Sequence, residues 1–325
     1  MNQKEYEDIL LRDIITKIEK YGGRKCLSSI ILTGSFGREE PTYAIGPGDS
    51  FELKSDVEIA LVFPNPSDKK HVYQIIEKVS SEFEEDLNLM AINEKRVKKA
   101  YNFNFSLKSP RYKTIFTYDL FNGSKTIWGH DFLSETKVEL EDVDIYEAKR
   151  LVANRIGELI YLQNVEDAEQ RAYLRTQWKG KLMLAIVSAW LICEGEYVSS
   201  YHGQYNKAEA LRAQMDKQIG TNFFENYSKV FGFLRDSGNE YEVEDYILCE
   251  YVKNIDAYFK SRNISKPKVN SISRILKYCI KYLKTGMQYG LFGFENNILQ
   301  ALIVDYHKQD SRCEQSADIW HKVLY

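Results

Sequence analysis

The sequence predicts an α+β fold, with a mixed sheet and helices in its first half and only helices in its second half. Three observations lead to this prediction. Short apolar runs at 28–33 and 56–63 end in turn residues and have the length of buried strands. Beyond about residue 143, apolar residues instead recur at helical spacing. The chain of 325 residues is long enough for about two domains, which we place at 1–143 and 144–325.

The first elements follow from local patterns. Residues 5–21 have apolar side chains at helical spacing and stop at Gly22-Gly23, so they predict an amphipathic helix. The strand at 28–33 leads into a short helix at 34–40. Residues 42–51 contain two glycines and a proline, and we interpret them as an inserted, turn-rich loop before the strand at 56–63.

The remaining elements of the first half follow a proline-rich turn after the second strand. Ser67 is a candidate cap for a helix that runs to about Leu87. Residues 112–121 alternate like a strand, and Asn122-Gly123 is a typical hairpin turn before a last strand at 125–128.

The second half has only one proline, Pro267, and its apolar residues favour helices throughout. A helical bundle that follows an α/β domain forms the other wall of a cleft, which is a usual place for substrates. The predicted helices are 145–163, 168–193, 207–219, 223–234, 243–259, 271–285 and 297–307.

The composition argues against several classes of protein. The formal net charge is −3 and the isoelectric point is about 6.1, whereas a dedicated nucleic-acid-binding surface is usually basic. The five cysteines are scattered without C-x-x-C spacing, which argues against a disulfide framework or a zinc site. The N-terminus is polar and no apolar run has membrane-spanning length. We therefore expect a cytoplasmic protein that does not bind membranes or long nucleic acid.

Two short motifs carry the chemistry. Gly34-Ser35 forms the turn after the first strand, and Asp56-Val57-Glu58 opens the second. Residues i and i+2 of a strand point to one face, so the two carboxylates lie side by side and repel unless a cation neutralises them. Mg²⁺ usually sits between carboxylates and substrate phosphates, and backbone N–H groups of a turn can hold a phosphate chain. The motifs together predict metal-dependent transfer from a nucleoside triphosphate.

This arrangement resembles the polymerase-β-like nucleotidyltransferase superfamily, whose signature is an apolar residue, then Gly-Ser or Gly-Gly, then an acid-apolar-acid strand. Within it, the motifs at 34–38 and 55–58 are most similar to those of aminoglycoside nucleotidyltransferases and their relatives. The resemblance covers about residues 25–130. The connection from Arg38 to Lys54 is longer than is usual in the family, which makes the insertion at 42–53 a candidate for specificity.

A third carboxylate is expected from a neighbouring strand, because one strand cannot surround an ion. Asp119 is the first candidate, since Ile115, Thr117 and Asp119 share one face of the predicted strand near its end. In the resembling family the third acid also lies on a later strand, where it ligates metal or deprotonates the acceptor hydroxyl. The alternative is a turn aspartate with local hydrogen bonds, and Asp131 is the second candidate.

The first half also offers groups for the triphosphate. Gly34 allows the backbone to approach phosphate closely, and the hydroxyl and N–H of Ser35 can donate to the β and γ phosphates. Ser35 can equally well cap a helix. Arg38 follows one turn later and either faces the same phosphates or is solvated.

The second half offers weaker candidates for nucleotide binding. Arg171, Arg175 and Lys179 form a basic stripe at spacing i, i+4 and i+8, which is more typical of a solvated helix face. Lys181 lies among apolar residues and is our second-domain candidate for a phosphate contact. Three of the 23 tyrosines are candidates to stack on a base or sugar, namely Tyr197, Tyr201 and Tyr205.

The expected activity is Mg²⁺-dependent transfer of a nucleoside monophosphate from a triphosphate such as ATP to a small hydroxyl- or phosphate-bearing acceptor, with release of pyrophosphate. The resemblance implies that Asp56, Glu58 and Asp119 hold two Mg²⁺ ions about 4 Å apart, with Mn²⁺ as an alternative ion. The alternatives are a toxin-like transferase that acts on tRNA or protein, a cyclic-oligonucleotide synthase, and a catalytically silent binding protein.

Overall fold

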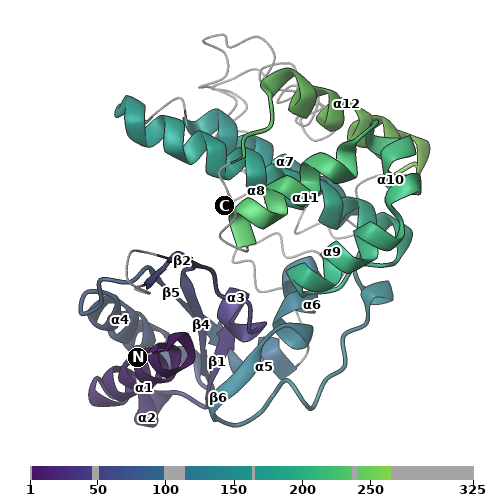
Figure 1. Cartoon of the computed structure of the whole chain (residues 1–325). Coiled ribbons are helices and arrows are strands. Elements are labelled where there is room, and N and C mark those ends of the chain that lie inside the picture. Colours follow the sequence, from purple (N-terminus) through teal and green to yellow (C-terminus); the bar gives the residue numbers. More distant parts are fainter. Residues whose placement is uncertain (1, 46–50, 99–113, 163–164, 236–240, 265–325) are drawn as a thin grey trace, which may run out of the picture. The chain divides into compact units, whose positions relative to one another are not determined.

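The computed structural model describes residues 2–45, 51–98, 114–162, 165–235 and 241–264 (Figure 1). These residues form two compact units. Unit 1 holds the described residues up to Val143 together with the short segment Ser199–Tyr201. Unit 2 holds the described residues from Asp144 to Val198 and from His202 onward.

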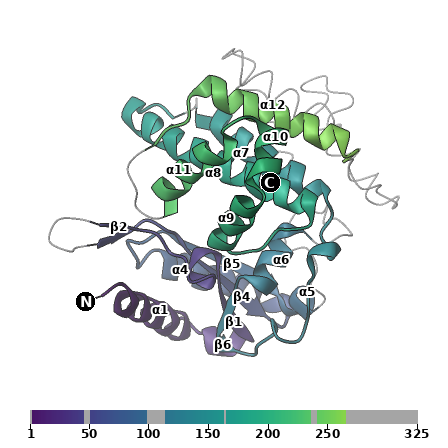
Figure 2. The ribbon, with the colours of Figure 1, turned by 45° about the vertical axis from the view of Figure 1, so that its right-hand side comes forward.

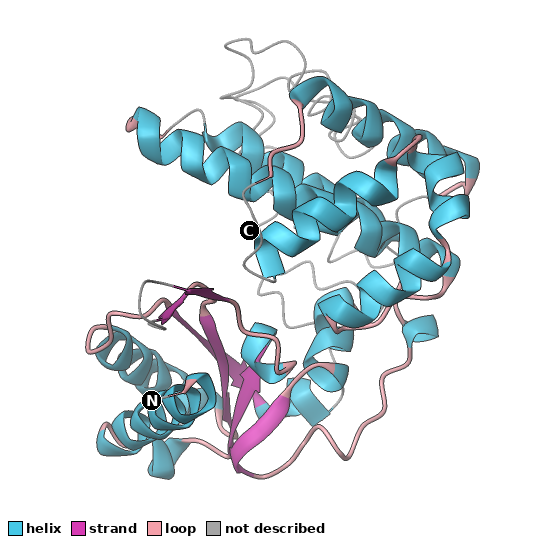
Figure 3. Cartoon of the chain, in the orientation of Figure 1, coloured by secondary structure: helices cyan, strands magenta, loops and turns pink. Residues whose placement is uncertain are grey.

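Unit 1 is built on a four-stranded mixed sheet; Figure 3 draws its strands, and those of a separate two-stranded sheet, in magenta. In spatial order the strands are β5 (Leu87–Asn93), β4 (Val57–Phe63), β1 (Ser29–Thr33) and β6 (Lys125–Gly129). β1 is antiparallel to both of its neighbours, whereas β4 and β5 are parallel. With the helices described below, this sheet confirms the α+β fold class that the sequence predicts.

Helices cover both faces of the sheet. Alternate strand residues such as Leu32 and Ile59 face a core shared with α1 (Gln3–Lys20), α2 (Gly23–Cys26) and α4 (Lys69–Ser80). The residues between them, such as Ile31 and Ala60, face a second core with α5 (Glu94–Lys98) and α6 (Ile115–Asn122). The side chains of Glu58 and Thr33 belong to the second face by the same alternation, so α6 lies on the face that carries the acids.

The insertion after Arg38 is not only a loop. Tyr43–Ile45 (β2) and Phe51–Leu53 (β3) pair as a two-stranded antiparallel sheet. The Tyr43 hydroxyl donates to Glu7 Oε1 at 2.7 Å, and the ring of Phe51 meets Tyr6 edge-on at 5.6 Å. The hairpin is therefore fastened to α1 by contacts that no local pattern indicates.

The helix predicted to run to Leu87 ends earlier. A 3₁₀ turn, η2 (Pro66–Asp68), precedes α4, which stops at Ser80, and the predicted cap Ser67 lies inside that turn. β5 begins at Leu87, where the predicted helix ends, and no element is predicted for the residues that follow; β5 pairs in register along the whole of β4. The strand character of this short apolar run arises from its pairing beside a buried strand, which no local pattern encodes.

The strand predicted at 112–121 is wrong within the described residues, since Ile115–Asn122 is the helix α6. Its N-terminus is capped by Thr114, whose Oγ1 accepts from the Thr117 N–H at 3.3 Å. Its C-terminus closes at Gly123, so Asn122-Gly123 ends a helix and forms no hairpin turn. The β-branched and aromatic residues of α6 have strand propensity. The N-terminal cap and the burial of Leu120 stabilise the helix more than this propensity disfavours it.

Unit 2 is helical, as predicted, with α7, α11 and α12 packed against α8 (Figure 2). The predicted helix at 207–219 is divided near Leu211, and the predicted helices at 271–285 and 297–307 lie outside the described residues. The helices of unit 2 are α7 (Tyr146–Tyr161), α8 (Ala168–Glu194), α9 (Tyr201–Ala210), α10 (Arg212–Ile219), α11 (Phe223–Arg235) and α12 (Asp245–Ser261).

No helix in the described part of the chain combines the length and the apolar character that a membrane span requires.

Candidate functional site

The two acids of the motif lie where β4 begins. Asp56 directly precedes the strand and Glu58 is its second residue, with Val57 between them fully buried in the core beneath α1 and α4. Because side chains alternate, Asp56 and Glu58 project toward the opposite face. The antiparallel register pairs Glu58 with Thr33, the last residue of β1, so the turn that follows β1 lies beside this carboxylate.

Gly34 packs directly against Glu58. A Cβ atom at Gly34 would lie 1.9 Å from Glu58 Oε2, and the φ angle of Gly34 is +64°, a conformation that residues with side chains rarely adopt. Both facts require glycine here. The structure thus brings the backbone of the Gly34-Ser35 turn into contact with one of the two predicted metal ligands.

Ser35 is buried on the turn α3 (Gly34–Gly37), and its hydroxyl has no hydrogen-bond partner among the described residues. The helix-cap alternative for Ser35 is not observed, because Thr33 occupies the cap position and makes no capping hydrogen bond. A buried hydroxyl without a partner is rare in folded proteins. Ser35 is therefore a donor that a bound oxyanion would satisfy.

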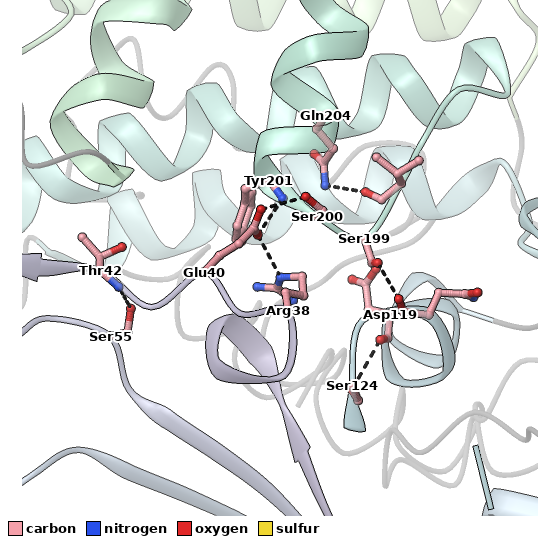
Figure 4. Close-up of polar contacts among 12 residues, drawn as sticks. Arg38, Glu40, Thr42, Ser55, Asp119, Ser124, Ser199, Ser200, Tyr201 and Gln204 are labelled. Carbon is pink, nitrogen blue, oxygen red and sulfur yellow. Dashed lines mark hydrogen bonds and ion pairs between the residues drawn. The ribbon is translucent and has the colours of Figure 1, made fainter. Parts of the chain in front are cut away.

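Arg38 lies just after this turn and is also nearly buried, with 12% of its side chain exposed. Its Nε is 3.7 Å from Glu40 Oε2, and its guanidinium carbon lies 4.8 Å from the centre of the Tyr201 ring (Figure 4). Nε has no hydrogen-bond partner in the described part of the chain. Arg38 is thus shielded from solvent, and its Nε–H group is available to donate to a ligand.

The segment Ser199–Tyr201 belongs to unit 1 although its chain neighbours on both sides belong to unit 2. Glu40 holds it, since Ser200 Oγ donates to Oε1 at 2.7 Å and the Tyr201 N–H donates to Oε2 at 2.9 Å (Figure 4). Ser199 Oγ also donates to the Asn122 carbonyl at 3.1 Å. The sequence gives no signal for Glu40, because its partners lie 160 residues away.

Asp119 lies on α6 and not on a strand of the sheet. Its carbonyl oxygen accepts from the Gly123 N–H at 2.7 Å. Among the described residues there is no group of three or more His, Cys, Asp or Glu side chains able to hold a metal. The three-acid arrangement expected from Asp56, Glu58 and Asp119 is therefore not found there, and a role for Asp119 stays a prediction.

Asp131, the second candidate, is engaged in a turn after β6. Its Oδ1 accepts from Thr126 Oγ1 at 2.8 Å and from the Leu133 N–H at 3.3 Å. The hydrogen bond from Thr126 is the main cause that lowers the pKa of Asp131. These contacts give Asp131 a local structural role of the kind that short polar side chains have in turns.

The parallel register of β4 and β5 places Asn88 beside Glu58. Register partners in a sheet point to the same face, so an amide accompanies the acids there. Asn88 is not among the predicted site residues, because no strand is predicted directly after Leu87. Asp56 and Glu58 nevertheless supply hard carboxylate oxygens, the donor type that Mg²⁺ prefers, and so fit part of a magnesium site.

The basic stripe of α8 is engaged within unit 2. Arg171 donates to the Val165 carbonyl at 2.9 Å, and Arg175 pairs with Asp245 at 2.6 Å. Lys179 is buried and pairs with Asp245 at 2.7 Å and with Glu242. Arg175 and Lys179 of the stripe therefore form structural ion pairs, and Arg171 donates to a backbone carbonyl.

The expectation for the surroundings of Lys181 is corrected by the structure. Its side chain is exposed on α8, whereas the apolar residues that follow it are buried. The hydrophobic surroundings inferred from the sequence belong to the other faces of the helix. A phosphate contact from Lys181 stays a prediction.

The three candidate tyrosines have different surroundings. Tyr205 packs against Phe231 at 4.8 Å and Tyr227 at 5.8 Å, and its hydroxyl hydrogen-bonds with Ser228. Tyr197 is buried. Of the three, Tyr201 lies next to the candidate site, where its ring contacts the Arg38 guanidinium.

Comparison with known proteins finds similarity at the level of structure. No protein-family model matches the sequence, and neither does any curated protein. Among solved structures, the chain matches the spectinomycin adenyltransferase AAD(9) from Enterococcus faecialis, determined with ATP and spectinomycin. The match has 14% sequence identity and a TM-score of 0.44, and it covers 75% of this chain and 98% of that chain. Similarity at this level does not establish a shared activity, so the function rests on the site itself.

Proposed function

We propose that this protein is a Mg²⁺-dependent nucleotidyltransferase that moves a nucleoside monophosphate from a triphosphate such as ATP to a small acceptor and releases pyrophosphate. The observation that carries the proposal is the contact between the Gly34 backbone and the Glu58 carboxylate. It joins a turn suited to a phosphate chain to a pair of acids suited to a metal. In this proposal, residues 1–143 carry the chemistry.

Asp56 and Glu58 would hold the metal. When bound, Mg²⁺ neutralises the charge that develops on the attacking and leaving oxygens. Ser35 donates its otherwise unpaired hydroxyl to a phosphate oxygen, and Arg38 adds a positive charge one turn away. Gly34 keeps the backbone free of a side chain where the phosphate chain would approach.

The reaction is an in-line displacement. An oxygen of the acceptor attacks the α-phosphorus, the new P–O bond forms, and the bond to the bridging oxygen breaks so that pyrophosphate leaves with the electron pair. A hydroxyl acceptor gives its proton to a base, which is one of the two roles predicted for Asp119. The residues of the turn orient the triphosphate for this displacement, which is the main task of a protein in phosphoryl transfer. Asp119 as metal ligand or base, and Lys181 as a further phosphate contact, are predictions within this proposal.

The proposed acceptor is a small molecule with a hydroxyl or phosphate group. The slight acidity of the chain supports this over long nucleic acid, because a long anion requires a basic surface. If the triphosphate alone gives a product, the acceptor is a second nucleotide instead.

The proposal is tested by pyrophosphate release in the presence of Mg²⁺, each triphosphate in turn, and a small-molecule extract. Asp56→Asn and Glu58→Gln each remove one charge with little change in volume, and each should lower the rate about 100-fold or more. Glu77→Gln is the matched control, since Glu77 lies exposed on α4, away from both motifs. Wild-type rates in a folded Asp56→Asn variant would refute the metal-ligand assignment.

A further inference from the structure

We propose that Glu40 and Tyr201 are positioning residues that hold the Arg38 guanidinium ready for the triphosphate. This inference rests on the proposed function and assigns a role to the segment Ser199–Tyr201, which is distant in sequence from both motifs. It concerns contacts within unit 1 alone.

The first step is the state of Arg38. A guanidinium has five N–H donors in one plane. Here it is nearly buried, Nε has no hydrogen-bond partner among the described residues, and Glu40 Oε2 lies 3.7 Å from that Nε, too far for a hydrogen bond. A buried, charged donor without a partner is costly unless a ligand supplies the acceptor. Phosphate oxygens match the planar donors of arginine.

The second step is the role of Glu40. Both of its carboxylate oxygens accept hydrogen bonds from the segment, one from Ser200 Oγ and the other from the Tyr201 N–H. Glu40 therefore attracts Arg38 by charge but leaves the Nε–H group without an acceptor. Its main physical effect is to fix the Tyr201 backbone next to the arginine.

The third step is the geometry of Tyr201. An aromatic ring in cation–π contact with a guanidinium attracts its charge but supplies no oxygen or nitrogen acceptor for its N–H groups. The ring centre lies 4.8 Å from the guanidinium carbon, within the range of a cation–π contact. Tyr201 thus restricts the orientation of Arg38 without competing with an anion for its donors.

The segment is also fixed at its other end. Ser199 Oγ donates to the Asn122 carbonyl at the C-terminus of α6. The Ser199 side chain packs against Gly123, where a Cβ would meet Ser199 Cβ at 2.9 Å. Two anchors, Asn122 and Glu40, therefore hold these three consecutive residues against the rest of unit 1 and fix the position of the Tyr201 backbone.

The experiment compares binding of a triphosphate with binding of the corresponding monophosphate, with Mg²⁺, by titration calorimetry. The triphosphate used is whichever of ATP, GTP, CTP and UTP binds the wild-type protein most tightly. Arg38→Ala should weaken triphosphate binding about tenfold or more and leave the monophosphate nearly unchanged. Tyr201→Leu should produce a smaller loss of the same kind, whereas Tyr201→Phe keeps the ring and should bind like the wild type.

A double-mutant cycle shows whether Tyr201 acts through Arg38. In the Arg38→Ala background, Tyr201→Leu should have no further effect on triphosphate affinity. Glu40→Gln should weaken triphosphate binding in the wild-type background but not in the Arg38→Ala background. The controls are Glu39→Gln, the same charge change at an exposed neighbour, and Tyr73→Leu, which removes a cation–π contact with Lys69 on α4.

Three outcomes would overturn the inference. Full triphosphate affinity in Arg38→Ala would show that Arg38 does not contact the phosphates, while the proposed function would survive. An equal effect of Tyr201→Leu with and without Arg38 would show that Tyr201 does not act through it. A wild-type protein that binds no triphosphate would overturn the proposed function itself and this inference with it. Melting temperatures of all variants identify any that have lost the fold, and Glu40→Gln then tests the inference independently of Tyr201→Leu.

Discussion

At the scale of single residues, Gly34 is subject to two separate constraints. Its φ angle of +64° disfavours any residue with a Cβ, and a Cβ would in addition meet the carboxylate of Glu58. The first constraint concerns only stability. The second concerns the chemistry, because the far end of the Glu58 side chain would move to make room and the metal ligand would be displaced.

Gly195 allows these two effects to be separated. Gly195 has a φ angle of +74° and no atom lies within 4 Å of the place that a Cβ would occupy, so Gly195→Ala introduces backbone strain without a clash. We expect Gly34→Ala and Gly195→Ala each to lower the free energy of unfolding by about 1 kcal/mol. Only Gly34→Ala should also raise the Michaelis constant for the triphosphate. If the two variants have equal turnover and Michaelis constants, Gly34 is a structural turn residue and nothing more.

The residues of the site differ in how well the sequence could predict them. Gly34, Ser35, Asp56 and Glu58 lie in short motifs whose chemistry is local, and the structure brings the two motifs together through the pairing of β1 with β4. Glu40 has no local signal, since its partners come from far along the chain. Contacts of that kind depend on tertiary packing, which a pattern of single residues does not encode.

At the scale of elements, α6 shows how a local pattern can mislead. Ile115, Thr117 and Asp119 alternate as in a strand, yet Ile115–Asn122 is helical. The capping contact of Thr114 and the burial of Leu120 against the sheet outweigh strand propensity. The sequence does not reveal β5 for the related reason that its strand character arises from its place beside β4.

The cap of α6 gives a test of this account. Thr114→Ala removes the capping oxygen at a fully buried position and should lower the free energy of unfolding by about 1 kcal/mol or more. Thr16→Ala is the control, because Thr16 lies exposed on α1 and its hydroxyl donates to the carbonyl of Arg12 within the same helix. Urea unfolding curves measure both variants. If Thr114→Ala is as stable as wild type, the Thr114 cap does not stabilise α6 and cannot explain why this segment is helical.

At the scale of the whole molecule, the division into a mixed-sheet part and a helical part follows from periodicity, because long amphipathic or buried helices have a strong signal. Periodicity does not predict which charged residues on a helix are solvated and which form buried ion pairs. Lys179 falls on the basic stripe of α8, but it is buried against Glu242 and Asp245 and so contributes to the stability of unit 2.

This ion pair predicts a pH dependence. The pKa of Glu242 is lowered, first because Lys179 hydrogen-bonds to its carboxylate. A lowered pKa means that the contribution to stability is present above the ordinary value of 4.5 and is lost as the pH falls through the lowered value. Lys179→Met should therefore be less stable than wild type at neutral pH, by about 1 kcal/mol because Glu242 is half exposed.

The difference between Lys179→Met and wild type should shrink when the pH falls well below 4.5. Urea unfolding of both proteins across that range measures it. Lys207→Met provides the comparison, since Lys207 pairs with Glu196 on the surface and should change stability little at any pH. A difference for Lys179→Met that is constant with pH would show that the lysine acts by packing and not by charge.

The central claim is that the bond broken in the triphosphate is the one at the α-phosphorus. The most direct measurement incubates the protein with Mg²⁺, acceptor extract and a triphosphate labelled either at the α or at the γ phosphate. We predict that the α label appears in a new product and the γ label in pyrophosphate, and that Asp56→Asn abolishes both. Transfer of the γ label to an acceptor, or no transfer of either label by the wild-type protein, would contradict the account.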